Sequence, residues 1–368
     1  MKILFIGDYS NLHATLGKEL KRRGHEVSVL SDKCGYINSY ADIFLKREKG
    51  LTGGIKYLYD IFNLLPSLKN YDIVQFINPN FFHLRPGKIK YFFDKLKDQN
   101  HKIFLTLAGN DYFFCKACAE GKLFRFSEFK IGKDFSEYHL SDPAHLYEWM
   151  NYANKKWNEY FYAHIDGAMS VLPEYDMVAR EIIPEKTKFT NLPIDLLNLP
   201  NPSYKVSKPI KILIGIRSGM EIQKGAKKLL NIAKDIEKER PDKVFVETVS
   251  DIPFTQFIEK INSADIILDQ LYAYSPATTA LLSMAMGKAV ASGAQPEYYE
   301  YIGNPEMRPI ISLSPFDSDI KERLIYLVEN PEKIIDLGKA SRKIVEQNND
   351  VRKVADKYLE HWKTVLSQ

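Results

Sequence analysis

One short apolar pattern occurs twice in this chain, and it constrains the fold more than any other feature. The run KILFIG follows Met1, and the similar run KILIGI occupies residues 211–216. After the first run come a loop, an amphipathic helix that ends at Gly24, and a second strand pattern; strands that alternate with helices form a parallel sheet. The repeat therefore predicts an α/β fold of two Rossmann-like domains that face each other across a cleft.

Length and a proline-rich central segment predict the domain boundaries. A chain of 368 residues exceeds what a single core usually holds. The segment TNLPIDLLNLPNPSYKVSKP has no sustained period and is rich in proline and asparagine, which is typical of a domain junction. We predict a first domain over 1–195, a linker over 196–208, a second domain over 209–348, and a final amphipathic helix within 349–368.

Two cations and a run of small residues in the second half indicate a site for a diphosphate. Arg217 supplies a planar fork of donors and Lys224 a point charge, and both lie in the loop after KILIGI. The run Ser275–Ala280 lets a phosphate approach the free N–H groups at the start of the following helix. The alternative is that the cations are solvated loop residues and that Thr278 and Thr279 only begin the helix.

Three segments of the second half carry a resemblance to a known family. The segments are Gly215, Arg217, Lys224 and Gly225 in one loop, then Ala264–Gln270, then Leu282–Val290. In the same order, retaining glycosyltransferases of the GT-B fold have a loop G-R-x-x-x-x-K-G, an A-D segment before the donor helix, and E-A-M-A-x-G-x-P-V. The second half of the chain therefore resembles the donor-binding half of these enzymes.

The resemblance implies an activity and a set of donor contacts. It implies that a hexosyl group moves from a UDP- or GDP-sugar to a glycan or lipid-linked acceptor, with retention, in cytoplasmic synthesis of surface polysaccharide or glycolipid. It also implies that Arg217 and Lys224 stabilise the departing diphosphate, that no further cofactor is required, and that the final helix packs back on the first domain. The implied donor-binding residues are Gly215, Ile252, Pro253, Tyr274, Ser275, Thr278 and Thr279.

The chain departs from this family at two glutamates that lie eight residues apart. Tyr274 and Leu282 occupy the two positions, the second of which binds the ribose of the donor in the family. Leucine cannot accept a hydrogen bond, so another group binds the ribose, or the donor is held differently, or activity has been lost. Glu297, after the next predicted strand, is the hypothesised substitute.

The acceptor half shows fewer signals. Polar loops follow two of its predicted strands, and the carboxyl ends of parallel strands are where α/β domains bind ligands. The expected acceptor-binding residues are Gly7, Asp8, Ser10, Asn11 and Asn110. Asp111 is a candidate for orienting an acceptor hydroxyl, with a strand-end turn residue as the alternative. Only Gly7 precedes the first helix, so the G-x-G-x-x-G fingerprint of a dinucleotide site is absent.

Charge and cysteine content argue against several other classes of protein. A formal net charge of +4, dispersed along the chain, does not predict a nucleic-acid partner. The chain has three cysteines, Cys34, Cys115 and Cys118, of which the last two form a C-x-x-C pair with no second pair. No signal peptide is visible, so we expect a reducing cytoplasm and no metal site. The triplet 317–319 (DSD) resembles a metal-binding D-x-D, but it precedes a helix, where aspartates cap free N–H groups.

The run from Phe81 to Lys102 mixes aromatic and basic residues. Such a run can seat the first domain on the inner face of an anionic membrane, where a lipid-linked acceptor would lie. The same spacing suits an ordinary surface helix whose aromatic residues are buried. No apolar run reaches the length of a membrane span.

Two other functions stay open at this point. A sugar-nucleotide epimerase of the same fold would also bind a diphosphate, but it needs acid and base carboxylates that the sequence does not clearly show. A non-catalytic binding module would need no acid or base carboxylate. No Ser-His-Asp or Cys-His set with motif support favours hydrolase chemistry.

Overall fold

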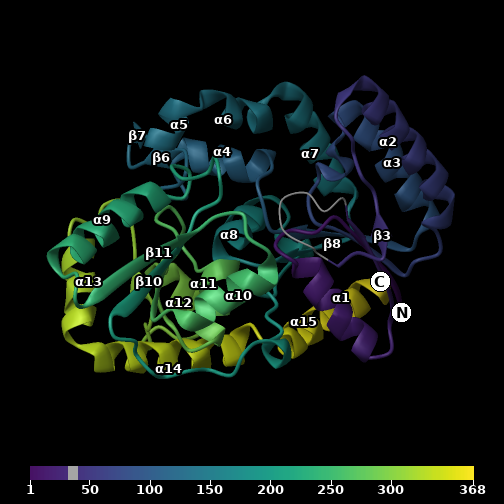
Figure 1. The fold of residues 1–368 in the computed structure, drawn as a ribbon. Coiled ribbons are helices and arrows are strands. Elements are labelled where there is room, and N and C mark those ends of the chain that lie inside the picture. Colours follow the sequence, from purple (N-terminus) through teal and green to yellow (C-terminus); the bar gives the residue numbers. More distant parts are fainter. Residues whose placement is uncertain (32–39) are drawn as a thin grey trace. The chain divides into compact units, whose positions relative to one another are not determined.

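The chain folds into two compact units, each with its own parallel sheet (Figure 1). The structure is a computed structural model that describes residues 1–31 and 40–368. Unit 1 comprises Met1–Ala117, Ala144–Pro193 and Val351–Gln368, and unit 2 comprises Cys118–Pro143 and Ile194–Asp350. An α/β chain with two Rossmann-like halves is therefore confirmed.

Unit 1 is built on a seven-stranded sheet in which all neighbouring strands are parallel. The strand order is β3-β2-β1-β4-β5-β8-β9, which is the order of a Rossmann sheet with one further strand. The strands are β1 (Lys2–Ile6), β2 (Glu26–Ser31), β3 (Ile43–Phe44), β4 (Ile73–Phe76), β5 (Lys102–Leu107), β8 (Gly167–Ser170) and β9 (Thr187–Phe189).

Helices connect or flank these strands. They are α1 (Leu12–Arg22), α2 (Gly50–Leu64), α3 (Pro86–Gln99), α6 (Pro143–Met150), α7 (Tyr152–His164), α8 (Pro173–Ile182) and α15 (Val351–Leu366), with 3₁₀ turns at Leu65–Ser67, Phe81–His83 and Pro184–Lys186. Helix α4 (Tyr112–Glu120) leads from unit 1 into unit 2.

Unit 2 is built on a five-stranded parallel sheet. Its order, β11-β10-β12-β13-β14, is that of a flavodoxin-like domain. Its strands are β10 (Ile210–Gly215), β11 (Val244–Val249), β12 (Ile266–Leu268), β13 (Ala289–Ser292) and β14 (Ile311–Ser312). Its helices are α9 (Ala226–Glu239), α10 (Phe254–Ser263), α11 (Thr278–Ala285), α12 (Pro296–Tyr301), α13 (Ile320–Glu329) and α14 (Pro331–Asn348), with a 3₁₀ turn at Leu196–Asn198. The remaining elements are a small antiparallel pair, β6 (Lys130–Ile131) and β7 (Asp134–Phe135), and α5 (Glu137–Ser141).

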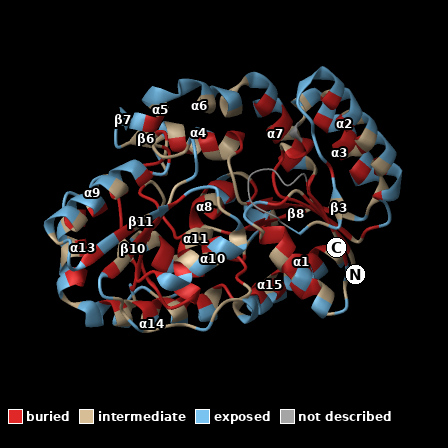
Figure 2. Ribbon diagram, in the orientation of Figure 1, coloured by how far each residue is buried: buried red, intermediate tan, exposed pale blue. Residues whose placement is uncertain are grey.

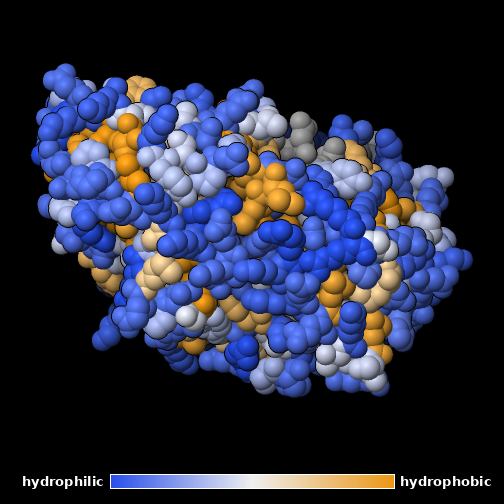
Figure 3. Space-filling view, turned by 90° about the horizontal axis from the view of Figure 1, so that it is seen from below, coloured by the Kyte–Doolittle hydropathy of each residue, from blue (hydrophilic) through white to orange (hydrophobic). Residues whose placement is uncertain are grey.

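The strands are buried and the helices are two-faced (Figure 2). Residues 3–6 of β1 and residues 289–291 of β13 are fully buried, as expected for parallel strands covered on both faces. Helix α15 buries Val351, Val354, Ala355, Tyr358, Trp362 and Val365, the spacing of one helical face. The surface shown in Figure 3 is largely hydrophilic, with scattered apolar side chains. Burial of one face of each helix therefore follows the sequence period.

A buried polar network fixes α15 within unit 1. The Trp362 indole Nε1–H donates to Gln75 Oε1 at 3.0 Å, and Gln75 Nε2 donates to the Thr106 hydroxyl at 2.9 Å. Thr106 lies 2.9 Å from His13 Nε2, while His13 Nδ1–H donates to the Gly7 carbonyl at 2.7 Å. Burial lowers the pKa of His13 to about 3, so the ring is neutral and its Nε2 accepts the Thr106 proton.

Residues 118–143 lie in a different unit from the one that the sequence predicts. The predicted division puts them in the first domain, between segments that do belong to unit 1. Their side chains instead contact loops of unit 2: Phe126 stacks on Tyr274 with ring centroids 4.7 Å apart and meets Phe316 at 5.9 Å. Aromatic packing therefore holds residues 118–143 against unit 2.

Among the residues that the structure describes, no helix has both the length and the apolar composition needed to cross a membrane.

Candidate functional site

The predicted donor-binding residues all follow the carboxyl ends of strands of the five-stranded sheet. Gly215 ends β10, and Arg217 follows it; Ile252 and Pro253 follow β11; Tyr274 to Thr279 follow β12; Glu297 follows β13. In a parallel sheet these ends share one edge, and the chain changes direction between β10 and β12, where open α/β sheets bind ligands. The topology therefore brings the predicted donor residues to one edge of unit 2.

Lys224 is seated on the segment that follows β12. Its carbonyl accepts the N–H of Leu271 at 2.9 Å, and Gly225 has a φ of 72°. A Cβ at Gly225 would lie 2.7 Å from Leu271 Cβ, so glycine is needed for this close approach. The charge of the exposed Lys224 ammonium lowers the pKa of the buried Asp269 carboxyl group. Asp269 also accepts a hydrogen bond from the Ser292 hydroxyl at 3.0 Å, which lowers its pKa too. Burial nevertheless raises the pKa of Asp269 above its usual value.

Arg217 lies by the loop that follows β11. Its neighbour Ser218 donates to Asp251 and lies 3.1 Å from the Ser250 hydroxyl. Hydrogen bonds from the two serines lower the pKa of Asp251, and the charge of Arg217 lowers it further. Arg217 is thus next to the predicted base-binding loop, while Lys224 is next to the segment that leads to α11.

The start of α11 is open, whereas the start of α1 is closed. Ala277 is the N-cap residue of α11, and its side chain makes no capping hydrogen bond. In α1 the Asp8 carboxylate accepts from the N–H of His13 at 2.9 Å and of Ala14 at 3.3 Å. Free N–H groups at a helix start attract phosphate, so of these two helix starts that of α11 offers the better environment for phosphate.

Arg125 joins two of the predicted donor residues, and the sequence did not single it out. Its N–H donates to the Tyr274 hydroxyl at 2.5 Å, its guanidinium lies 5.3 Å from the Tyr274 ring centroid, and it pairs with the Glu297 carboxylate at 3.1 Å. The partners are 149 and 172 positions away in the chain. No local pattern could have indicated this contact.

The two positions where the family has glutamates are apolar here. Tyr274 is 2% exposed and Leu282 is 7% exposed, and the Tyr274 ring is packed between Phe124 and Phe126. Glu297 keeps 29% of its side chain exposed. It is therefore a carboxylate that a ligand at this edge can reach.

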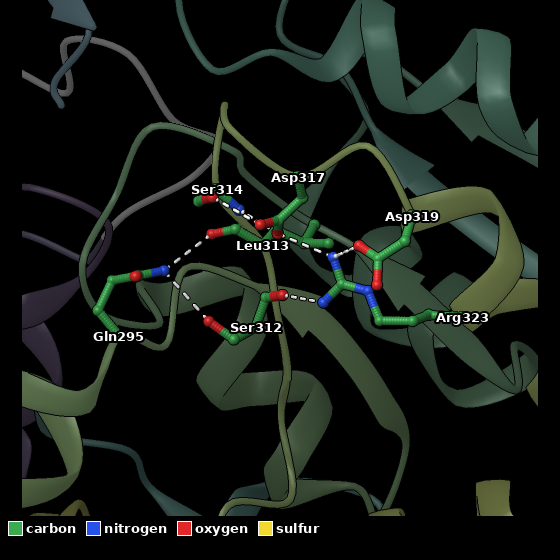
Figure 4. A network of polar contacts seen from close by, with 7 residues as sticks. All are labelled: Gln295, Ser312, Leu313, Ser314, Asp317, Asp319 and Arg323. Atoms are coloured by element: carbon green, nitrogen blue, oxygen red, sulfur yellow. Dashed lines mark hydrogen bonds and ion pairs between the residues drawn. The ribbon is translucent and has the colours of Figure 1, made fainter. Parts of the chain in front are cut away.

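A polar network continues from this cluster to β14 (Figure 4). Gln295, whose N–H donates to the Tyr274 carbonyl at 2.8 Å, also donates from Nε2 to the Ser312 hydroxyl and the Leu313 carbonyl, each at 3.1 Å. On the other side of β14, Arg323 donates to the Ser312 carbonyl at 2.6 Å. The loops after β12, β13 and β14 are thus fixed relative to one another.

The two aspartates of the triplet at 317–319 take part in this network. Asp317 accepts from the Ser314 N–H at 2.9 Å and pairs with Arg323 at 2.8 Å, and Asp319 pairs with Arg323 at 3.1 Å. Asp319 is the N-cap residue of α13, but its side chain makes no capping bond. The predicted capping is therefore wrong, because Arg323 takes both carboxylates.

No metal site is found in the described part of the chain. Among residues 1–31 and 40–368, no group of three or more His, Cys, Asp or Glu side chains could hold a metal ion. Cys115 and Cys118 are both buried. Cys34 lies outside the described residues.

The predicted acceptor residues lie where β1 and β5 end in unit 1. Gly7, Ser10 and Asn11 have positive φ values of 80°, 51° and 61°. A Cβ at Gly7 would lie 2.4 Å from a methyl carbon of Ile77, so this position requires glycine. The buried Asn11 Oδ1 has no hydrogen-bond partner among the described residues. Asn110 follows β5, and its carbonyl accepts from the Asn78 amide at 2.8 Å.

Asp8 and Asp111 are both engaged in local hydrogen bonds. Asp8 caps α1. Burial raises the pKa of Asp8 to about 7, although hydrogen bonds from four backbone N–H groups act to lower it. Asp111 accepts from the Phe114 N–H at 2.8 Å and from the Tyr162 hydroxyl at 2.5 Å. Desolvation by burial raises the pKa of Asp111. These contacts are what a strand-end turn residue makes, and the acceptor role of Asp111 stays a hypothesis.

Comparison with solved structures finds the same fold in several glycosyltransferases. No protein-family model and no curated sequence matches the chain. Sucrose-phosphate synthase from Thermosynechococcus elongatus superposes with a TM-score of 0.62 and 12% identity over 100% of both chains. WaaG, a glycosyltransferase involved in lipopolysaccharide biosynthesis, gives 0.62 and 12% over 97% of this chain and 98% of its own. HepE from Anabaena, in complex with UDP-glucose, gives 0.59 and 12% over 99% and 100%. The chain therefore has the GT-B fold.

Proposed function

We propose that this chain is a retaining hexosyltransferase that moves a sugar from a nucleoside diphosphate to a glycan or lipid-linked acceptor in surface polysaccharide or glycolipid synthesis. The observation that carries the proposal is the edge of unit 2 where Arg217, Lys224 and the open start of α11 follow the carboxyl ends of neighbouring strands. HepE, which shares the fold, is described with UDP-glucose. We extend that class of ligand to this chain.

The chemistry of the leaving group explains these residue types. When the sugar–phosphate bond breaks, negative charge grows on the diphosphate, and fixed donors that already point at it stabilise the transition state without reorganising. Lys224 offers an ammonium, Arg217 a guanidinium, and the start of α11 offers backbone N–H groups and the positive end of a helix dipole. We assign the diphosphate to this group of donors.

Retention is carried over from the resemblance to retaining glycosyltransferases. In a retaining reaction of this type the departing phosphate oxygen itself takes the acceptor proton, and a separate base is not needed. A diphosphate held firmly in unit 2 would then serve as both leaving group and base.

Calorimetric titration with UDP, UMP, GDP and GMP tests the proposal. We expect one diphosphate to bind at least about tenfold more tightly than its monophosphate, a difference of about 1.4 kcal/mol. Equal affinity for the two would contradict a diphosphate site. Turnover of the preferred sugar nucleotide in the absence of any acceptor would favour the epimerase instead.

A further inference from the structure

Helix α2 of unit 1 exposes a row of large apolar side chains. Leu51, Ile55, Tyr59 and Phe62 are 83%, 61%, 65% and 48% exposed, and their spacing puts them on one face. The opposite face of α2 buries Gly53, Tyr57 and Ile61 in the core. We call the four exposed residues the α2 stripe. A contiguous exposed apolar surface of this kind marks an interaction site.

The run from Phe81 to Lys102, which the sequence analysis considered for membrane contact, does not supply this surface. Its four phenylalanines, at positions 81, 82, 92 and 93, are at most 6% exposed, because they pack in the core of unit 1. Tyr91 is 47% exposed, and its ring centroid lies 5.7 Å from that of Phe62 in the α2 stripe. The exposed apolar surface is therefore formed by α2 and extended by one residue of α3.

A cavity of about 990 Å³ adjoins the start of the α2 stripe. Leu51 and Ile55 line it, so the stripe and the cavity share two residues. Three cations also line it, Arg47, Arg85 and Lys88, against one carboxylate, that of Glu148. The volume lies in the range of ligand sites, and the excess of positive charge suits an anion.

Hydrogen bonds connect one residue that lines the cavity to a predicted acceptor residue. Asn80 lines the cavity, and its buried Oδ1 has no partner among the described residues. The Asn80 N–H donates to Asn78 Oδ1 at 2.8 Å, and Asn78 Nδ2 donates to the carbonyl of Asn110 at 2.8 Å. Asn110 is one of the predicted acceptor-binding residues, so the cavity and the acceptor edge are joined by two hydrogen bonds.

We propose that unit 1 docks on an anionic lipid bilayer through the α2 stripe and that the cavity beside it receives the phosphate headgroup of a lipid. An apolar helical face beside cations is the arrangement that lies in a membrane interface and attracts anionic headgroups. This inference rests on the proposed function, since it selects a lipid-linked phosphate as the acceptor class. It moves the apolar membrane contact from the aromatic residues of the run at 81–102 to α2, while Arg85 and Lys88 of that run supply part of the charged contact.

Vesicle co-sedimentation at low salt tests the charged part of the site. Vesicles of phosphatidylcholine with phosphatidylglycerol should bind the full chain, and vesicles of phosphatidylcholine alone should bind it at least about tenfold more weakly. The variant Arg85→Gln/Lys88→Gln should lose about tenfold or more in binding to the anionic vesicles. The control Lys227→Gln/Lys228→Gln removes the same charge from exposed positions of α9 in unit 2 and should bind as the wild type does. Equal loss in both variants would overturn the proposal.

A second pair of variants tests the apolar stripe. Leu51→Ser/Ile55→Ser should abolish vesicle binding, because it removes the side chains that enter the interface. Leu140 and Leu197 are each 67% exposed in unit 2, so Leu140→Ser/Leu197→Ser is the matched control and should bind normally. Retained binding in the α2 variant would overturn the docking face.

Soluble glycerol phosphate separates headgroup capture from general attraction to charge. Glycerol phosphate should displace the protein from anionic vesicles at a lower ionic strength than sodium chloride does. Equal displacement by the two would overturn the headgroup site. Calorimetry with the preferred nucleoside diphosphate accompanies each variant. If vesicle binding fails while nucleotide binding persists, this inference fails and the proposed function stands.

Discussion

The charge of Lys224 is held beside the segment that leads to α11, and that of Arg217 beside the loop after β11. Each should donate charged hydrogen bonds to a bound diphosphate. Lys224→Ala and Arg217→Ala should each weaken binding of the preferred nucleoside diphosphate by about 1.5–3 kcal/mol in calorimetry. The control is Lys228→Ala, an exposed lysine of α9. Unchanged affinity in both site variants would remove the assignment.

Glu297 is the candidate that replaces the missing ribose-binding glutamate. If its carboxylate accepts a ribose hydroxyl, 2′-deoxy-UDP should bind the wild type about 1.5–3 kcal/mol more weakly than UDP. In Glu297→Ala the two ligands should bind nearly equally, because the hydrogen-bond acceptor has been removed. The same difference in both proteins would show that another group contacts the ribose. If the chain prefers GDP, its 2′-deoxy analogue takes the same place.

Asp8 should make stability depend on pH in an unusual direction. Its pKa is raised from 3.8 to about 7, so the folded state holds one proton more than the unfolded state between these values. Stability from this group is therefore lost as pH rises through that window, by about 1.4 kcal/mol per pH unit. Relative to wild type, Asp8→Asn should gain stability between about pH 4 and 7 in urea unfolding. No relative gain would contradict the raised pKa of the buried Asp8 carboxyl group.

His13 acts in the opposite sense over nearly the same window. Its folded pKa of about 3 lies below 6.5, so the stability that this neutral ring contributes is lost as pH falls below about 6.5. In the wild type the two groups largely offset each other between about pH 4 and 6.5. The difference between wild type and Asp8→Asn isolates the carboxyl group.

At the scale of elements, α15 is held by packing and by one buried hydrogen bond. Trp362→Phe leaves Gln75 Oε1 without its indole donor inside the core, which should cost about 1–3 kcal/mol of unfolding free energy in urea titration, beyond the loss of ring area. Trp149→Phe in α6 is a control that removes an indole from a half-buried position without breaking a bond, because its Nε1 has no hydrogen-bond partner among the described residues. Equal destabilisation by the two would show that the bond contributes nothing.

Elements whose signals are local were predictable from the sequence. The repeated strands β1 and β10 and the amphipathic α15 follow from residue spacing, and the loop with Arg217 and Lys224 follows from its position after β10. Carboxyl ends of parallel strands share an edge, so the order of elements was enough to place these residues.

The remaining features depend on contacts between distant parts of the chain. Residues 118–143 belong to unit 2 through partners of Arg125 and Phe126 that lie well over a hundred positions away. Helix α2 carries apolar residues on two faces, and its sequence period cannot tell which face another element covers. Arg323 takes the carboxylates that were expected to cap α13, a competition that only the folded loop reveals.

At the scale of the molecule, the two units have related topologies but different helix starts. In unit 1 the N–H groups of α1 are capped by the chain's own carboxylate, whereas in unit 2 the start of α11 has no side-chain cap. We therefore assign the diphosphate to unit 2 and the acceptor to unit 1. The cleft between them stays a prediction.

A crystal structure of the protein with its preferred nucleoside diphosphate, UDP or GDP, tests the central claim most directly. We expect both phosphates to lie at the carboxyl edge of the five-stranded sheet, in hydrogen-bond distance of Lys224, Arg217 and the N–H groups of Thr278 and Thr279. A nucleotide bound elsewhere, with both cationic side chains turned into solvent, would contradict the account.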